Sequence, residues 1–229
     1  MTPAHTIPCR LFMRAGKAGF LIPALLVFLS AGMTGCITVK QPYNKISYYT
    51  LEYDPPPISD LTPLPASIRI ERFTVAPSYN TENMIFREKA YTRDAYPYHK
   101  WHANPGRLVQ DFLKRDLLKS GLFTAVFPAT GRFAASYVLN GSVDEFLEHD
   151  NAKNWEVVLA VSVTLLAANE PNSSKQIVFQ KSFTKRQTCE KKNPQAVAKA
   201  MSFAMSALST DIIRTIHAML GEKRLSFSM

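Results

Sequence analysis

The chain has 229 residues, of which 46% are hydrophobic and 20% are charged, a balance typical of a globular protein and not of a disordered one. Its formal net charge is +9. The basic residues are scattered among acidic ones, so the pattern argues against nucleic-acid binding. It favours attraction to an acidic membrane surface or an acidic partner.

The N-terminus has the pattern of a secretory signal peptide. Residues 1–19 carry three positive charges and no acidic residue, and residues 20–33 form an uncharged apolar run. A transmembrane helix needs about 20 apolar residues, which this run of 14 does not supply. The sequence therefore predicts a signal peptide over residues 1–35, cleaved between Gly35 and Cys36.

The residues before the cleavage point resemble the lipobox of bacterial lipoproteins, with Met33 where Leu is usual. The resemblance implies that the Cys36 thiol receives diacylglycerol and that acyl chains anchor the mature protein, each buried CH₂ contributing about 0.8 kcal/mol. Residue 37 is Ile and not the Asp that favours inner-membrane retention in enteric bacteria, so the expected destination is the outer membrane. The alternative is a soluble secreted protein with a coincidental cysteine.

Three regions follow the signal peptide. Residues 36–66 are rich in proline and predict a lipidated N-terminus with an extended tether, in which residues 48–53 are expected to dock as an edge strand. Residues 67–221 predict a periplasmic α+β domain, and residues 222–229 a basic tail. Removing the three leader charges from +9 leaves +6, on about 194 residues, enough for one domain but not for two large ones.

Hydrophobic periodicity predicts the element order β-β-β-α-β-β-β-β-α. The first helix opens at the cap pair Asn104-Pro105 and ends at Gly121, and the second opens at Asn193-Pro194 and ends at Gly221. We expect an α+β fold with a single sheet of about five to seven strands and two long amphipathic helices packed on it. The strands are expected over residues 68–75 (with a bulge near Glu71), 83–91, 95–101, 123–127, 136–147, 155–168 and 175–188.

No recognised catalytic or metal-binding motif is present in the sequence. It contains no G-x-S-x-G, glycine-rich phosphate loop or H-E-x-x-H. His99 and His102 are three residues apart in an extended stretch, which places them on opposite faces without further ligands. Cys189 has no neighbouring His and is expected to be an inert thiol. The sequence therefore predicts neither an enzyme nor a cofactor.

Aromatic and basic residues alternate at high density over residues 84–102. One interpretation is a half-buried hairpin whose rings lie in the core. The other is a recognition surface, because Tyr, Trp and Arg provide large contact areas with hydrogen-bonding tips. The candidate partner-binding residues are Met84, Phe86, Arg87, Tyr96, Tyr98 and Trp101.

The ordered set of features resembles the ABC-type transport auxiliary lipoproteins, the outer-membrane lipoprotein partners of MCE lipid-transport systems. The features are the lipobox Cys36, Tyr49-Thr50-Leu51, the strand 68–75 with Pro77, Phe86-Arg87 through Tyr98 to Trp101, the helix leading to Ser120-Gly121-Leu122-Phe123, the strand 137–146 and the terminal amphipathic helix. The resemblance spans nearly the whole mature chain. The long leader and the basic tail depart from it.

The resemblance implies a periplasm-facing adaptor at the outer membrane that docks on an MCE-domain protein and performs no bond chemistry. Members of the family can self-associate into rings, so a homo-oligomer is also implied. Another hypothesis is a lipid- or glycolipid-binding lipoprotein that acts alone, which requires an enclosed apolar pocket between helix and sheet. A third, an envelope hydrolase, finds no catalytic residues in the sequence.

Overall fold

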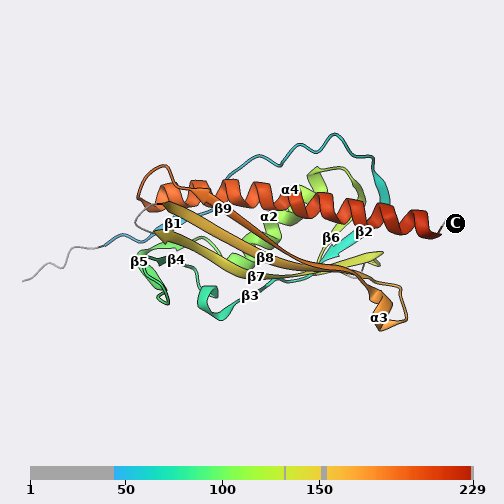
Figure 1. Ribbon diagram of the computed structural model, residues 1–229, viewed down its shortest axis with the longest axis horizontal. Helices are drawn as coiled ribbons and strands as arrows, with labels where there is room; N and C mark the ends of the chain where they lie inside the picture. Colours follow the sequence, from blue (N-terminus) through green and yellow to red (C-terminus); the bar gives the residue numbers. More distant parts are fainter. Residues whose placement is uncertain (1–43, 132, 151–153, 228–229) are drawn as a thin grey trace, which may run out of the picture. The chain divides into compact units, whose positions relative to one another are not determined.

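Three long antiparallel strands form the framework of the fold: β7 (Tyr137–Asp150), β8 (Trp155–Ala167) and β9 (Ile177–Thr188). The computed structural model describes residues 44–131, 133–150 and 154–227, and Figure 1 shows these three strands crossing the domain. A short helix, α3 (Ser173–Gln176), connects β8 to β9. In β8, alternate residues from Val157 to Leu165 are almost fully buried, as expected for a central strand with one face in the core.

The other edge of β7 is covered by three short parallel strands placed end to end. These are β2 (Leu64–Ile70), β3 (Thr74–Val75) and β4 (Asn83–Arg87). Between β2 and β3 the chain advances four residues while β7 advances three, so one extra residue lies at the interruption where the sequence predicted a bulge. Phe73 lies in this interruption, and a Cβ at Gly141 would stand 2.3 Å from its ring.

Three more strands extend the sheet beyond the short strands β2 and β4. β6 (Phe123–Pro128) pairs with β2, β5 (Asp94–Trp101) pairs with β4, and β1 (Ser47–Tyr49) pairs with β5. The described chain thus forms a mixed nine-stranded sheet, which is larger than the five to seven strands predicted. The difference arises because strands of two or three residues are too short to show the period of two that identifies a strand in sequence.

Helix α2 (Pro105–Lys119) begins where the sequence predicted it. The Asn104 side chain accepts a hydrogen bond from the backbone N of Gly106 at 3.0 Å, and Pro105 occupies the first turn. Gly106 is required by space, since a Cβ there would lie 2.7 Å from Val75 Cγ2. Gly121, with φ of +66°, follows the end of the helix as a C-terminal glycine should.

Helix α4 (Pro194–Phe227) packs beside α2 on the apolar face of β8 and β9 (Figure 1). It opens at the predicted cap, where the Asn193 side chain accepts from the backbone N of Ala196 at 2.9 Å. It does not end at Gly221 as predicted but continues into the segment predicted as a tail, because a glycine within a helix costs only about 1 kcal/mol.

Within the described residues, one stretch of α4, Pro194–Glu222, is long and apolar enough to cross a membrane by length and composition. Most of its most apolar window is buried inside the domain. Its core residues are fully covered, namely Met201, Met205, Leu208, Ile212, Ile213 and Ile216. The burial identifies α4 as the central core helix of the domain.

The proline-rich segment predicted as a tether is attached to the domain over its described part. Leu51 and Ile58 are buried, and strand β2 already begins at Leu64, before the predicted domain start. Proline prevents regular backbone pairing but leaves neighbouring apolar side chains free to pack. The described chain from Asn44 onward therefore belongs to the folded domain.

Candidate functional site

The predicted cleavage and lipid-attachment residues, Gly35 and Cys36, lie outside the described residues, as does the whole of the predicted signal peptide 1–35. The described chain starts at Asn44, eight residues after Cys36. The chain that follows this cysteine is described from Asn44 onward, where it is held against the domain by the contacts below.

Residues 50–63, which we call the strap, run along α4 in the same direction as the helix. The backbone N of Glu52 donates to Ser202 Oγ at 2.9 Å, and farther on Arg214 binds both carboxylate oxygens of Asp60 at 2.7 and 2.8 Å. His217 Nε2 then lies 2.8 Å from the carbonyl oxygen of Thr62. These contacts, together with buried Leu51 and Ile58, fasten the strap over the helix at several points.

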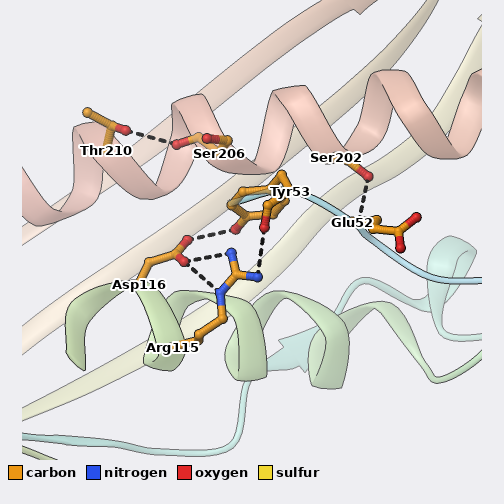
Figure 2. Close-up of polar contacts among 7 residues, drawn as sticks. All are labelled: Glu52, Tyr53, Arg115, Asp116, Ser202, Ser206 and Thr210. Atoms are coloured by element: carbon orange, nitrogen blue, oxygen red, sulfur yellow. Dashed lines mark hydrogen bonds and ion pairs between the residues drawn. The ribbon is translucent and has the colours of Figure 1, made fainter. Parts of the chain in front are cut away.

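A polar cluster joins the strap to α2 (Figure 2). The Tyr53 hydroxyl donates to Asp116 Oδ2 at 2.7 Å, and Arg115 Nη2 and Nε donate to Asp116 Oδ1 at 2.8 and 2.9 Å. Arg115 Nη1 also donates to the Tyr53 carbonyl oxygen at 3.0 Å. We call this group, Tyr53, Arg115 and Asp116, the clamp.

The clamp satisfies a carboxylate that is almost completely buried, since Asp116 is 1% exposed. The Arg115 guanidinium lies 4.4 Å from the centre of the Tyr53 ring and 4.6 Å from that of Phe112, which adds cation–π attraction. Burial, followed by the neighbouring Asp116, raises the pKa of the Tyr53 hydroxyl far above its usual value. Tyr53 therefore remains a proton donor, and the buried charge keeps its partners.

The six candidate partner-binding residues of segment 84–102 differ in how exposed they are in the structure. Met84 and Trp101 are 1% and 2% exposed and belong to the core, where Trp101 packs edge-on against Phe146 with ring centres 5.0 Å apart. A partner has no access to these two side chains. Their role in this structure is to fix β4 and β5 on the sheet.

Three further candidates are half-buried and already have partners within the domain. Phe86 and Tyr96 have ring centres 4.7 Å apart, and Arg87 Nη2 lies 3.0 Å from His149 Nε2. The Tyr96 hydroxyl donates to Glu148 at 3.0 Å. Of the six candidates only Tyr98, at 42%, is strongly exposed.

Glu148 is a buried carboxyl that the sequence analysis did not single out. It accepts hydrogen bonds from the Tyr96 hydroxyl and from Trp155 Nε1. Burial raises the pKa of Glu148, and burial with the nearby Glu148 carboxylate raises the pKa of the Tyr96 hydroxyl. An acidic residue two positions after Phe146 in an otherwise apolar alternation was the available signal.

The surroundings of His99, His102 and Cys189 can be compared with what a metal site or a catalytic thiol requires. His99 Nδ1 lies 3.1 Å from the Tyr49 hydroxyl, while His102 is exposed, and the described residues contain no group of three metal-ligating side chains. Cys189 is buried, and burial raises the pKa of its thiol to about 12. A thiol held protonated at neutral pH is a poor nucleophile.

A surface cleft of about 640 Å³ lies between the start of the strap and the start of α4. Its lining is polar and apolar in about equal parts and includes an ion pair in which Lys199 Nζ lies 2.7 Å from Glu190 Oε1. Other lining residues are Tyr48, Tyr49, Thr50, Glu52, Lys191, Asn193, Gln195, Ala196, Ala198 and Ser202. The cleft adjoins β1, next to the place where the described chain begins.

Solved structures share this fold at low sequence identity. A Xanthomonas campestris protein of family DUF330 aligns with a TM-score of 0.70 and 16% identity, covering 78% of this chain and 99% of its own. An uncharacterised protein aligns with a TM-score of 0.57 and 15% identity, covering 75% of this chain and 99% of its own. No curated protein matches the sequence.

A family model described as the ABC-type transport auxiliary lipoprotein component matches residues 49–213. The match begins at β1, includes the strap, both halves of the clamp and segment 84–102, and ends within α4. Because this range covers well over half of the chain, the protein belongs to the family of ABC-type transport auxiliary lipoproteins.

Proposed function

We propose that the protein is an outer-membrane-anchored periplasmic lipoprotein that acts as the auxiliary, adaptor component of an ABC-type MCE system for lipid transport between membranes. The observation that carries the proposal is the family match over residues 49–213, preceded in the same chain by a lipobox cysteine, Cys36. An adaptor works by contact. It needs an anchor and a rigid domain with an accessible surface.

The anchor in this proposal is acylated Cys36 at the start of the mature chain. Several acyl chains on one cysteine hold a protein at a bilayer far more firmly than a single chain does. The strap and the clamp attach the chain that follows to α4 and α2, so that the strap is part of the folded domain. The choice of the outer membrane rests on Ile37.

The protein-binding surface in this proposal is the outward stripe of α4. Phe203 is 50% exposed, and Lys199 Nζ lies 6.0 Å from the centre of its ring. Large aromatic side chains beside a cation are typical of residues that dominate binding at protein interfaces. The stripe belongs to the longest rigid element of the domain, which suits a contact surface.

The packing of the core favours an adaptor over a lipoprotein that binds lipid alone. Such a protein needs an enclosed apolar space between helix and sheet. Here Met201, Met205 and Leu208 of α4 are 0% exposed and belong to the packed core between α4 and the sheet. The cleft described above is open to solvent and about half polar in its lining, so it is not an enclosed apolar space.

Affinity purification of the full-length protein from detergent-solubilised native membranes tests the proposal. We expect an MCE-domain protein to be recovered with the wild type and to be reduced at least several-fold with Phe203→Ser. Ile177→Ser is the matched control, because Ile177 is equally exposed, at 52% against 50%, but lies on β9. Absence of any MCE-domain protein with the wild type would contradict the proposal.

A further inference from the structure

Four side chains at the edge of the sheet formed by β1 and β5 make up a small amphipathic surface, which we call the edge patch: Ile46, Tyr48, Tyr98 and Lys100. β1 and β5 are parallel, and Tyr48 lies opposite Lys100 while Ser47 lies opposite His99. Ile46 immediately precedes β1, and Tyr98 lies two residues before Lys100 on β5; both are exposed, as is Tyr48.

Three of the four side chains in the edge patch are large, partly apolar and exposed. Ile46, Tyr48 and Tyr98 are 40%, 58% and 42% exposed. Within the described part of the chain, neither tyrosine hydroxyl forms a hydrogen bond. Among residues 44–131, 133–150 and 154–227, β1 pairs with β5 alone, so within that part of the chain the patch borders an edge of the sheet.

The position of the patch in the chain connects it to the lipid anchor. Ile46 is ten residues after Cys36, and Asn44, where the described chain begins, is eight residues after it. Eight residues cannot span more than about 29 Å even when fully extended. An anchored Cys36 therefore keeps Asn44, three residues before β1, within that distance of Cys36.

The chemistry of the patch fits the headgroup layer of a membrane. Tyrosine is enriched at membrane interfaces because its ring is apolar and its hydroxyl bonds water or headgroups. Lys100 and the exposed Lys45 supply cations for anionic headgroups, and Ile46 supplies an apolar side chain. A patch of four residues is small for a protein interface, which buries about 800 Å² on each partner.

A weak surface suffices for lipid because the anchor already holds the domain close to the bilayer. Covalent linkage turns a second contact into an intramolecular event at a high effective concentration, so little intrinsic affinity is needed. We propose that the edge patch rests on the lipid headgroups of the membrane that carries the anchor and thereby sets the orientation of the domain. This proposal rests on the proposed function, through the acylation of Cys36.

Site-directed spin labelling of the full-length lipidated protein in phosphatidylethanolamine–phosphatidylglycerol vesicles tests the proposal. Labels are placed at Tyr98→Cys and, as a matched control, at Ile177→Cys, in a background with Cys189→Ala. Ile177 has similar exposure but pairs with Leu166, near the end of β8. β4, which connects β5 and β1 to the sheet, pairs with β7 beside the start of β8. Tyr48→Cys provides a second label within the patch.

We expect both patch labels to be several-fold less accessible to a water-soluble nickel relaxation agent than the Ile177→Cys label, and more accessible to oxygen. Patch labels as open to nickel as the control, on protein shown by mass to be acylated, would overturn this inference and leave the proposed function intact. Protection that appears only after an MCE-domain protein is added would also overturn it, in favour of a protein contact. Unacylated protein would refute the anchor and this inference together.

Discussion

The clamp and the edge patch use similar side chains for opposite purposes. In the clamp, Tyr53 and Arg115 surround a buried carboxylate and every polar group has a partner. In the edge patch, Tyr48 and Tyr98 are exposed, and neither hydroxyl has a hydrogen-bond partner among the described residues. The comparison shows what decides the role of a tyrosine near basic residues. Where the fold places a buried hydrogen-bond acceptor next to its hydroxyl, the tyrosine stabilises the domain. Where it does not, the tyrosine stays exposed and is available for contact.

The largest expected difference in stability is between a substitution in the strap and one in the edge patch. Leu51→Ala removes a side chain that is 2% exposed and should lower the free energy of unfolding by about 3 kcal/mol, through lost burial and a cavity. Ile46→Ala, five residues earlier and 40% exposed, should change it by less than about 0.5 kcal/mol. Urea unfolding of both variants measures the difference. Equal, small effects would show that the strap is a loose linker.

A smaller effect is expected from the hydroxyl of the clamp. Tyr53→Phe removes the hydrogen bond to the Asp116 carboxylate and should cost about 2 kcal/mol, because the acceptor is charged and buried. Tyr48→Phe removes an exposed hydroxyl and should leave the unfolding midpoint unchanged. If the two variants unfold at the same urea concentration, the clamp does not hold the strap.

Glu148 gives a prediction in pH. Burial raises its pKa, so the folded protein binds its proton more tightly than the unfolded chain, and stability falls as pH rises from the ordinary glutamate value near 4.3 through the folded value. Glu148→Gln should remove that part of the slope in unfolding experiments at a series of pH values. Glu190 is exposed, and its hydrogen bond with Lys199 shifts its pKa in the opposite direction, below the usual value. Glu190→Gln is therefore the control and should leave the part of the slope due to Glu148 unchanged. An unchanged slope in Glu148→Gln would contradict the assignment.

The smallest effect on stability is expected at the edge patch itself. Tyr98→Ser should shift the free energy of unfolding by less than about 0.5 kcal/mol, because the side chain is exposed and lacks hydrogen bonds to described residues. Trp101→Ser, three residues later in the same strand, should unfold the domain or cost more than about 3 kcal/mol. Calorimetry of the two variants would separate the contact surface from the core within one strand.

Local signals in the sequence located much of the fold. The cap pairs Asn104-Pro105 and Asn193-Pro194 placed the starts of both helices, because helix capping depends on neighbouring residues alone. The same kind of signal misplaced the end of α4, since Gly221 adopts helical geometry instead of ending the helix. The long strands β7 and β8 were predicted within a few residues of their bounds.

The features that the sequence did not reveal depend on distant partners. Tyr53 and Asp116 are 63 residues apart, and Glu52 meets Ser202 across 150 residues, so no local pattern announces the clamp or the docked strap. Within segment 84–102, spacing could not distinguish Trp101 from Tyr98, because the irregular pairing of β4 with β5 decides which ring faces the core. Pro97, which has no backbone donor, lies in that irregular stretch.

The mass of the mature N-terminal peptide, from protein purified out of native membranes, tests the central claim most directly. The account predicts a peptide that begins at Cys36, lacks residues 1–35 and carries the added mass of acyl chains, with the protein in the outer-membrane fraction. Cys36→Ser should abolish the modification. An unmodified peptide that begins before or after Cys36, from protein found free in solution, would contradict the account.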